Sequence, residues 1–338
     1  MNRRHLLKIT AAGLAAPAVL RAQPPMTKLR FTLDFRVTGQ TAPFFVAHYK
    51  GYFAEEGLDV AIDVGNGSVA SITRVASGAY DLGFGDISSL IEYNVAHLGT
   101  PAVQAVYQYY NRAPFAIIGR RDRGVTDFKS LSGKRIAAAA VESTKRSWPM
   151  VARKVGMKPD TLSWVTTDFA SRDNVVVRGD VDGATYFHDS AVSLFQRMKL
   201  EDLAVLPYAD AGVNVYGNAV LASTKLINEN PRAVAGFVRA TNRALRETLL
   251  DPAAAMPHVK KREPLIDEKV ELERFRITSK YVAAPDTRAH GIGDIRKLTL
   301  DQQVEEVAEV YGLKFRPSAD AIYNLSFLPP RSERVLPA

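Results

Sequence analysis

The sequence predicts an α/β protein made of two lobes that the chain connects twice. Residues 59–86 show the order strand, glycine-rich turn, helix and strand, which is typical of a crossover in a parallel sheet. Residues 116–216 repeat a β-α-β rhythm of their own. The extended segment 214–222 is followed almost entirely by helical patterns. We therefore expect the second unit to be inserted into the first.

The composition is that of an ordinary globular protein. The chain has 338 residues, which is enough for two domains, with 46% hydrophobic and 24% charged residues. It contains no cysteine, which excludes disulfides, thiolate metal sites, cysteine nucleophiles and a lipidated N-terminal cysteine. The histidines show no metal-type spacing, and the sequence has no nucleophile elbow or phosphate-binding loop motif. We therefore expect no metal, no cofactor and no catalytic residue.

The N-terminal segment 1–22 resembles a twin-arginine signal peptide. Arg3 and Arg4 precede an apolar run that is too short to span a bilayer, and we expect cleavage after Ala22. Removal of the segment takes away four basic residues and no acid, so the net charge falls from +8 to +4. A mild, dispersed charge does not favour nucleic acid as a partner. The sequence thus predicts a soluble protein that is exported to the periplasm without an anchor.

The first lobe opens with an alternating strand at 28–34. A loop at 35–43 follows, with Gln40 and Thr41 at its tip, and Pro43 suits the first turn of a helix. The strand end and the loop tip together make a candidate ligand-binding edge, because α/β proteins hold ligands outside the carboxyl ends of their strands.

The crossover at 59–86 supplies two further strand ends. Its first strand stops at the glycines of the turn, and Ser68 is the expected N-cap of a helix that ends at 77–78. The second strand runs over 82–85 and stops at Asp86, which lies beside the end of the first strand of the chain.

The remaining elements follow from similar patterns, and breaks near 110–115 and 215–220 mark the passages between lobes. We expect lobe I to comprise residues 27–112 and 219–330, and lobe II residues 113–218. The other expected strands are 102–110, 115–119, 136–141, 162–166, 183–187 and 214–222, and the other expected helices are 86–94, 145–155, 171–178, 230–250, 266–283 and 299–311.

The turn after the strand near residue 60 allows three interpretations. Gly65, Gly67 and Ala70 fit the pattern G-x-G-x-x-A, with Asp86 at the end of the next strand, as in dinucleotide-binding proteins. This would suit an exported, cofactor-dependent oxidoreductase. The helix from Ser68 is short for that role, however. A plain structural turn is the second interpretation, and the favoured third is a small-ligand contact through Ser68 and the helix amides.

Several motifs resemble the opening of ABC-importer solute-binding proteins of the nitrate/sulfonate/taurine and thiamine-pyrimidine-precursor family. They cover roughly residues 29–140, and the rest agrees in layout. The motifs are Leu33–Asp34, Ala42–Ala47, Lys50–Phe53, Glu55–Val60, Gly65–Ser68, Val75–Gly78, Asp81–Asp86 and Leu131–Ile136. The resemblance implies the type II periplasmic-binding fold, in which two α/β lobes joined by two hinge crossings close on a solute.

The resemblance also maps ligand contacts onto the loop after Asp34 and onto the turns at 67–68, 85–86, 142–144 and 186–189. Aromatic residues at predicted strand ends and crossings add candidates for a cleft wall, although each alone is more often a core residue. The predicted ligand-binding residues are Asp34, Phe35, Gln40, Thr41, Gly67, Ser68, Asp86, Tyr107, Glu142, Ser143, Thr144, Trp148, Tyr186, His188, Asp189 and Tyr216.

These observations predict a monomeric periplasmic receptor that delivers a small organic solute to an ABC permease in the inner membrane. An aromatic or heterocyclic solute is favoured, and a sulfonate or carboxylate remains open. The eukaryotic pyrimidine synthases of similar architecture carry a cysteine-rich motif that this chain lacks, so we expect a binding protein and not an enzyme. The alternatives are the oxidoreductase named above and a ligand-sensing domain for a membrane receptor.

Overall fold

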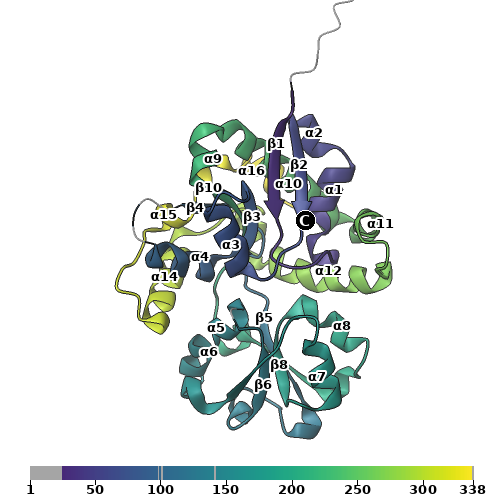
Figure 1. The fold of residues 1–338 in the computed structure, drawn as a ribbon, viewed down its shortest axis with the longest axis vertical. Helices are drawn as coiled ribbons and strands as arrows, with labels where there is room; N and C mark the ends of the chain where they lie inside the picture. The colour runs from purple at the N-terminus through teal and green to yellow at the C-terminus, as the bar shows by residue number, and fades with distance from the viewer. Residues whose placement is uncertain (1–24, 98, 100–101, 141, 337–338) are drawn as a thin grey trace, which may run out of the picture.

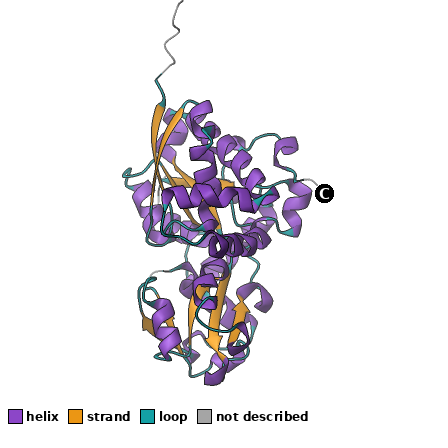
Figure 2. Cartoon of the chain, turned by 90° about the vertical axis from the view of Figure 1, so that its right-hand side faces the viewer, coloured by secondary structure: helices purple, strands orange, loops and turns teal. Residues whose placement is uncertain are grey.

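The computed structural model describes residues 25–97, 99, 102–140 and 142–336, and it has two lobes (Figure 1). The predicted signal segment 1–22 lies outside the described residues. Each lobe is built around a five-stranded sheet. Seen from the side, the two sheets follow one another along the long axis with helices packed around them (Figure 2).

The sheet of lobe I has the strand order β2-β1-β3-β10-β4. Strand β1 pairs in parallel with β2 and β3, whereas β10 is antiparallel to both of its neighbours. The ends of β1 and β3 are therefore adjacent, as the sequence predicted. The strands are β1 Thr27–Thr32, β2 Leu58–Asp63, β3 Leu82–Asp86, β4 Val103–Gln108 and β10 Asn218–Ser223.

The sheet of lobe II repeats this arrangement with the order β7-β6-β8-β5-β9. Strand β6 is parallel to β7 and β8, and β5 is antiparallel to β8 and β9. The strands are β5 Phe115–Arg120, β6 Arg135–Ala138, β7 Ser163–Thr166, β8 Gly183–Phe187 and β9 Leu203–Pro207. The chain leaves lobe I after β4 and returns at β10, so it passes between the sheets twice. The predicted fold class is confirmed, while the residue limits of the two lobes stay a prediction.

Helices cover both sheets. Those of the lobe I side are α1 Ala42–Tyr49, α2 Tyr52–Glu55, α3 Ser68–Ala76, α4 Ile87–Ala96, α9 Thr224–Glu229, α10 Pro231–Leu250, α11 Pro252–Arg262, α12 Glu268–Val282, α13 Pro285–His290, α14 Lys297–Tyr311, α15 Ala319–Ile322 and α16 Arg331–Arg334. Lobe II has α5 Ser143–Arg146, α6 Trp148–Lys154, α7 Arg172–Arg178 and α8 Val192–Phe195. Two short 3₁₀ helices border the space between the lobes, η1 Gly39–Thr41 and η5 His188–Ala191.

Several local predictions need correction. The helix expected at 145–155 is divided at Ser147, because Pro149 lacks the N–H that would continue α5. Strand β9 and the helices α8, α9, α11, α13, α15 and α16 were not predicted. Strand β10 begins at Asn218 instead of 214, so 214–217 belongs to the second passage between the sheets.

The turn before α3 also differs by one residue from the prediction. Gly67, not Ser68, is the N-cap, and its φ of 95° lies in the left-handed region that favours glycine. Ser68 is instead the first residue of the helix, and it is buried. Ser68 lines the space between the lobes.

Candidate ligand-binding site between the lobes

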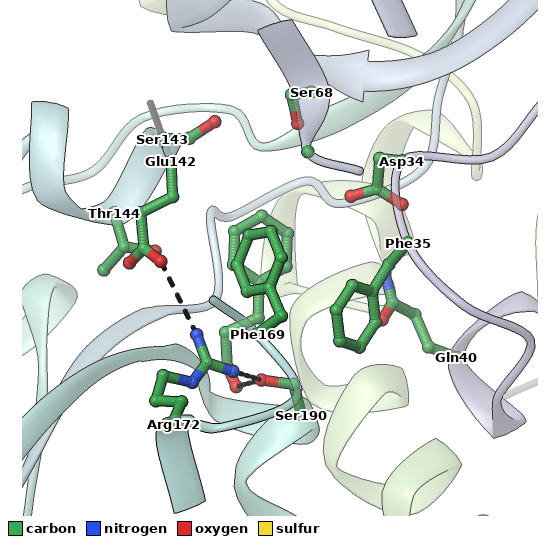
Figure 3. Close-up of a pocket in the computed structure, with 12 residues that line it drawn as sticks. Asp34, Phe35, Gln40, Ser68, Glu142, Ser143, Thr144, Phe169, Arg172 and Ser190 are labelled. Atoms are coloured by element: carbon green, nitrogen blue, oxygen red, sulfur yellow. Dashed lines mark hydrogen bonds and ion pairs between the residues drawn. The ribbon is translucent and has the colours of Figure 1, made fainter. Parts of the chain in front are cut away.

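A cavity lies between the two lobes where the strand ends of both sheets meet (Figure 3). Its atom-free space is about 430 Å³, part of which is open to solvent. Lobe I contributes Asp34, Phe35, Gln40, Gly67 and Ser68. Lobe II contributes Glu142, Ser143, Thr144, Phe169, Arg172, Phe187 and Ser190.

Asp34 is the charged group of the lobe I wall. It follows β1, and its backbone carbonyl accepts a hydrogen bond from the Gly67 amide at 2.6 Å, which ties it to the glycine turn. Asn218 Nδ2 donates to Asp34 Oδ2 at 2.6 Å, and Oδ1 is buried with no hydrogen-bond partner among the described residues. Burial raises the pKa of this carboxyl to about 7. Asp34 can therefore accept a hydrogen bond from a ligand, or donate one when protonated.

Gln40 supplies a neutral donor on the same wall. The hydroxyl of Tyr109 donates to the Gln40 backbone carbonyl at 2.6 Å and so fixes η1. The side-chain nitrogen Nε2 of Gln40 is buried and, within the described part of the chain, has no partner. A buried amide without a partner is costly, so Nε2 is available to a ligand acceptor.

The lobe II wall carries an ion pair that is already formed. Arg172 Nη1 lies 3.6 Å from Glu142 Oε2, and the side chains of both residues are 5% exposed. Arg172 Nη2 donates to Ser190 Oγ at 3.2 Å, and the Ala139 amide donates to Glu142 Oε2 at 3.0 Å. Burial raises the pKa of Glu142, and the guanidinium of Arg172 opposes that shift.

Aromatic rings frame this charged pair. The Arg172 guanidinium lies 4.0 Å from the centroid of the Tyr186 ring and 5.3 Å from that of Phe169. Phe169 also meets Phe35 of lobe I edge to face, with ring centroids 5.2 Å apart. The two phenyl rings thus make a direct contact across the lobes.

A wider groove adjoins the cavity and shares Gly67, Glu142 and Phe169 with it. Its atom-free space is about 1000 Å³, and it is lined as well by Asn66, Ala139, Ala140, Thr166, Thr167 and Asp168. Phe169 therefore lines both the cavity and the groove.

Eight of the sixteen predicted residues line the cavity: Asp34, Phe35, Gln40, Gly67, Ser68, Glu142, Ser143 and Thr144. The structure does not bring the other eight into its lining. Three of these are core aromatics with hydrogen bonds elsewhere. Tyr107 donates to Asn242 Oδ1 at 3.0 Å, Trp148 donates to the Pro159 carbonyl at 3.0 Å, and the Tyr216 hydroxyl accepts from the Arg296 amide at 2.8 Å.

The remaining five make hydrogen bonds of their own. Thr41 donates to the Thr38 carbonyl, and Asp86 caps α4 by accepting from the Ser89 amide at 2.9 Å. Tyr186 donates to Asp173 while its ring covers Arg172, and Asp189 accepts from the hydroxyls of Tyr110 and Thr278. His188 Nδ1 lies 2.8 Å from the Tyr281 hydroxyl, and burial lowers the pKa of this histidine to about 4.

Four lining residues were missing from the prediction: Phe169, Arg172, Phe187 and Ser190. They follow or end β7 and β8, whose positions the sequence did predict. The rule that ligands lie beyond the carboxyl ends of strands could have pointed to them. The glycine turn, in contrast, lines the cavity through Gly67 and Ser68, which favours the small-ligand interpretation of that motif.

Within the described residues, no three histidine, aspartate or glutamate side chains come together as metal ligands. The same part of the chain contains no helix whose length and apolar character would let it cross a membrane.

Comparison with known proteins gives the family. A sequence model described as NMT1/THI5 like matches residues 38–255. A 4-amino-5-hydroxymethyl-2-methylpyrimidine phosphate synthase of Aspergillus parasiticus is 26% identical over 265 residues, which are 75% of this chain and 76% of the relative. The riboflavin-binding protein RibY of Chloroflexus aurantiacus is 28% identical over 247 residues, or 72% and 69% of the two chains.

Solved structures share the fold. The alkanesulfonate-binding protein SsuA of Xanthomonas axonopodis pv. citri, bound to MOPS, superposes with a TM-score of 0.69 at 14% identity and covers 89% of this chain and 99% of its own. This likeness supports the periplasmic-binding fold.

The comparison contradicts one prediction. We expected the chain not to be an enzyme, because it lacks the cysteine-rich motif of the eukaryotic synthases. Several curated relatives are nevertheless named as pyrimidine phosphate synthases, at 23–26% identity. The absence of cysteine therefore does not exclude an enzymatic function.

Proposed function

The chain belongs to the NMT1/THI5-like family, and we propose that it is a periplasmic solute-binding protein of an ABC importer that captures a small aromatic or heterocyclic compound between its lobes. The observation that carries this proposal is the cavity itself. Two lobes enclose it, phenyl rings wall it, and buried polar atoms of Asp34 and Gln40 lack partners among the described residues. Ligand sites in proteins combine these features.

The arrangement of the polar atoms supports a ligand class. Asp34 Oδ1 and Glu142 Oε1 are buried acceptors, and Gln40 Nε2 is a buried donor, none of which has a hydrogen-bond partner in the described chain. A ring system with N–H or O–H groups and a neighbouring acceptor would satisfy them. Pyrimidine and flavin rings fit this description, and these are the compounds that the names of two relatives mention.

Closure of the lobes would complete the site. The passages at 109–114 and 208–217 connect the two sheets and are the places where a hinge motion would act. When the lobes meet, Phe35 and Phe169 come into contact and water leaves the cavity. Hydrogen bonds become stronger in such a site, so a few of them suffice for micromolar binding, which corresponds to about −8 kcal/mol.

A ligand screen tests the proposal. The protein without residues 1–22 is purified and heated with riboflavin, 4-amino-5-hydroxymethyl-2-methylpyrimidine, nitrate or MOPS. A ligand at 100 times its Kd stabilises the folded state by about 2.7 kcal/mol, which a thermal shift detects. We expect stabilisation by a ring compound and not by nitrate. Stabilisation by nitrate alone would contradict the proposed ligand class.

Synthesis of a pyrimidine phosphate is a second candidate function, because relatives that match over three quarters of the chain carry that name. Mass spectrometry separates the two functions. A carrier returns the bound compound unchanged, and the mass of the protein stays constant. A synthase would alter the mass of the recovered compound or of the protein.

Export and transport complete the proposed function. Residues 1–22 would direct the protein to the periplasm, where we expect it to act as a monomer with an inner-membrane permease. Deletion of 1–22 should leave the protein in the cytoplasm. If the gene instead neighbours a membrane receptor and no permease, a ligand-sensing role would be favoured.

A further inference from the structure

Helix α12 lies along the boundary of the two lobes (Figure 1). It packs on η1 and α11 on one side and on η5 and α8 on the other. In its first half it carries a buried ion pair, Arg274 with Glu271, whose side chains are 2% and 7% exposed. Buried pairs of this kind need further hydrogen bonds to offset their desolvation, and these bonds reach both walls of the cavity.

Glu271 holds the lobe I wall. One of its carboxylate oxygens, Oε2, accepts from the Gly39 amide at 2.5 Å and from Arg274 Nε at 2.8 Å. Gly39 approaches the helix so closely that a Cβ there would lie 2.1 Å from the Glu271 backbone oxygen. The next residue is Gln40, whose unpartnered side-chain amide lines the cavity. The carboxylate of Glu271 thus fixes the segment that carries Gln40.

Arg274 holds the lobe II wall. Its Nη1 donates to the Asp189 carbonyl at 2.7 Å, and its Nη2 donates to Ser193 Oγ at 3.0 Å. Ser190 lies in the same 3₁₀ helix as Asp189, and its hydroxyl accepts from Arg172 in the cavity wall. A single guanidinium therefore connects the Gln40 side of the cavity with the Ser190 and Arg172 side.

We propose that Arg274 is a positioning residue for ligand binding, which brings the two cavity walls into register and holds the lobes closed. The inference rests on the proposed solute-binding function. Separation of the lobes would break both bonds from Arg274 to lobe II, while the pair with Glu271 would remain within α12. The guanidinium would then lose two charge-assisted hydrogen bonds, so these two bonds favour the closed state.

The same helix provides a matched control. Arg276 pairs with Glu273 at the same spacing of three residues, but the two side chains are 58% and 54% exposed. Exchange of either arginine for methionine removes one positive charge from α12. Only the exchange at 274 removes contacts to lobe II.

The experiment measures the distance between the lobes. The chain has no cysteine, so two can be introduced without background labelling. Asn228→Cys on α9 and Asp160→Cys in lobe II are exposed positions for spin labels. Distance distributions are recorded for the otherwise unchanged protein, R274M and R276M, with and without riboflavin or 4-amino-5-hydroxymethyl-2-methylpyrimidine. Kd and dissociation rates are measured for each probe.

We expect R274M to give longer and broader distances than R276M, and at least a tenfold higher Kd through faster dissociation. Coinciding distributions for R274M and R276M would overturn the proposal. If R274M does not fold, Ser193→Ala removes one lobe II acceptor of Arg274, a hydroxyl to which Arg36 also donates at 3.4 Å. Arg36→Met is then the control, and S193A must still give longer distances than R36M. Failure of both probes to bind, with R274M still more open, would reject the proposed ligand class and leave the role of Arg274 standing.

Discussion

The two walls of the cavity differ in how their charged and polar groups are paired. In lobe I, Asp34 and Gln40 are buried with polar atoms that no described residue satisfies. In lobe II, the charge of Arg172 is compensated by Glu142, by Ser190 and by two aromatic rings. Both walls keep buried polar atoms without a partner in the described chain, among them Glu142 Oε1 and Arg172 Nε in lobe II. The charges of the lobe II wall are nevertheless paired with each other, whereas the partner of Asp34 is the neutral Asn218. We infer that lobe I determines which ligand binds and that lobe II provides a preformed wall that closes over the ligand.

The largest expected effect tests the ion pair that is already formed in the lobe II wall. Arg172→Met leaves the Glu142 carboxylate buried without its cation, which costs about 3–5 kcal/mol for a broken buried pair. The free energy of unfolding in urea should fall accordingly. Arg178, at the other end of α7, pairs with Asp180 with 63% of its side chain exposed. Arg178→Met should therefore change stability by less than about 1 kcal/mol. Equal losses in the two variants would contradict a preformed lobe II wall.

The same contrast explains what the sequence could and could not predict. The lobe I residues Asp34, Phe35 and Gln40 follow an alternating strand and occupy a loop whose ends the pattern defines. Glycine-rich turn chemistry marks Gly67 and Ser68 in the same way. Local structure determines the positions of these residues, so patterns over short stretches of sequence can predict them.

In the lobe II wall, Glu142, Ser143 and Thr144 were also predicted, but the burial of Arg172 depends on tertiary contacts that no local pattern contains. Arg172 opens an ordinary short helix, and an arginine there would be expected in solvent. It is buried only because Glu142, Ser190 and the rings of Phe169 and Tyr186 converge on it. Trp148 lies in the core and outside the cavity lining, since a large aromatic side chain fills a core as readily as a cleft.

A second prediction concerns the pH dependence of stability and tests the buried carboxyl groups of lobe I. Burial raises the pKa of Asp34 and of Asp86 to about 7, from an ordinary value near 3.8. Between these values the folded state binds more protons than the unfolded state, so stability falls as the pH rises from about 4 to 7. Each carboxyl contributes on the order of a few kcal/mol to this fall in the free energy of unfolding. Asp34→Asn should flatten part of this slope in pH-dependent unfolding. An unchanged slope would show that Asp34 is not the titrating group.

A third prediction asks whether lobe I chooses the ligand. Asp34→Asn keeps an oxygen that can accept from Asn218 but removes the charge, so a ligand that donates to Asp34 should bind more weakly by about 1.5–3 kcal/mol. That is roughly a 10- to 150-fold rise in Kd by calorimetry. Ser143→Ala in the lobe II wall should cost about 1 kcal/mol or less. A larger loss for Ser143→Ala than for Asp34→Asn would reverse the assignment of the two walls.

The smallest expected effect concerns the place where the walls touch. Phe169→Leu keeps an apolar side chain but removes the edge-to-face contact with Phe35, which is worth about 0.5–1.5 kcal/mol. Phe315, which is 55% exposed, provides the control exchange Phe315→Leu. Because Phe169 belongs to the lobe II wall and not to the polar recognition surface, the loss should appear as faster dissociation with the ranking of ligands unchanged. A changed ranking would mean that the lobe II wall also determines which ligand binds, and this would contradict the assignment of ligand selectivity to lobe I.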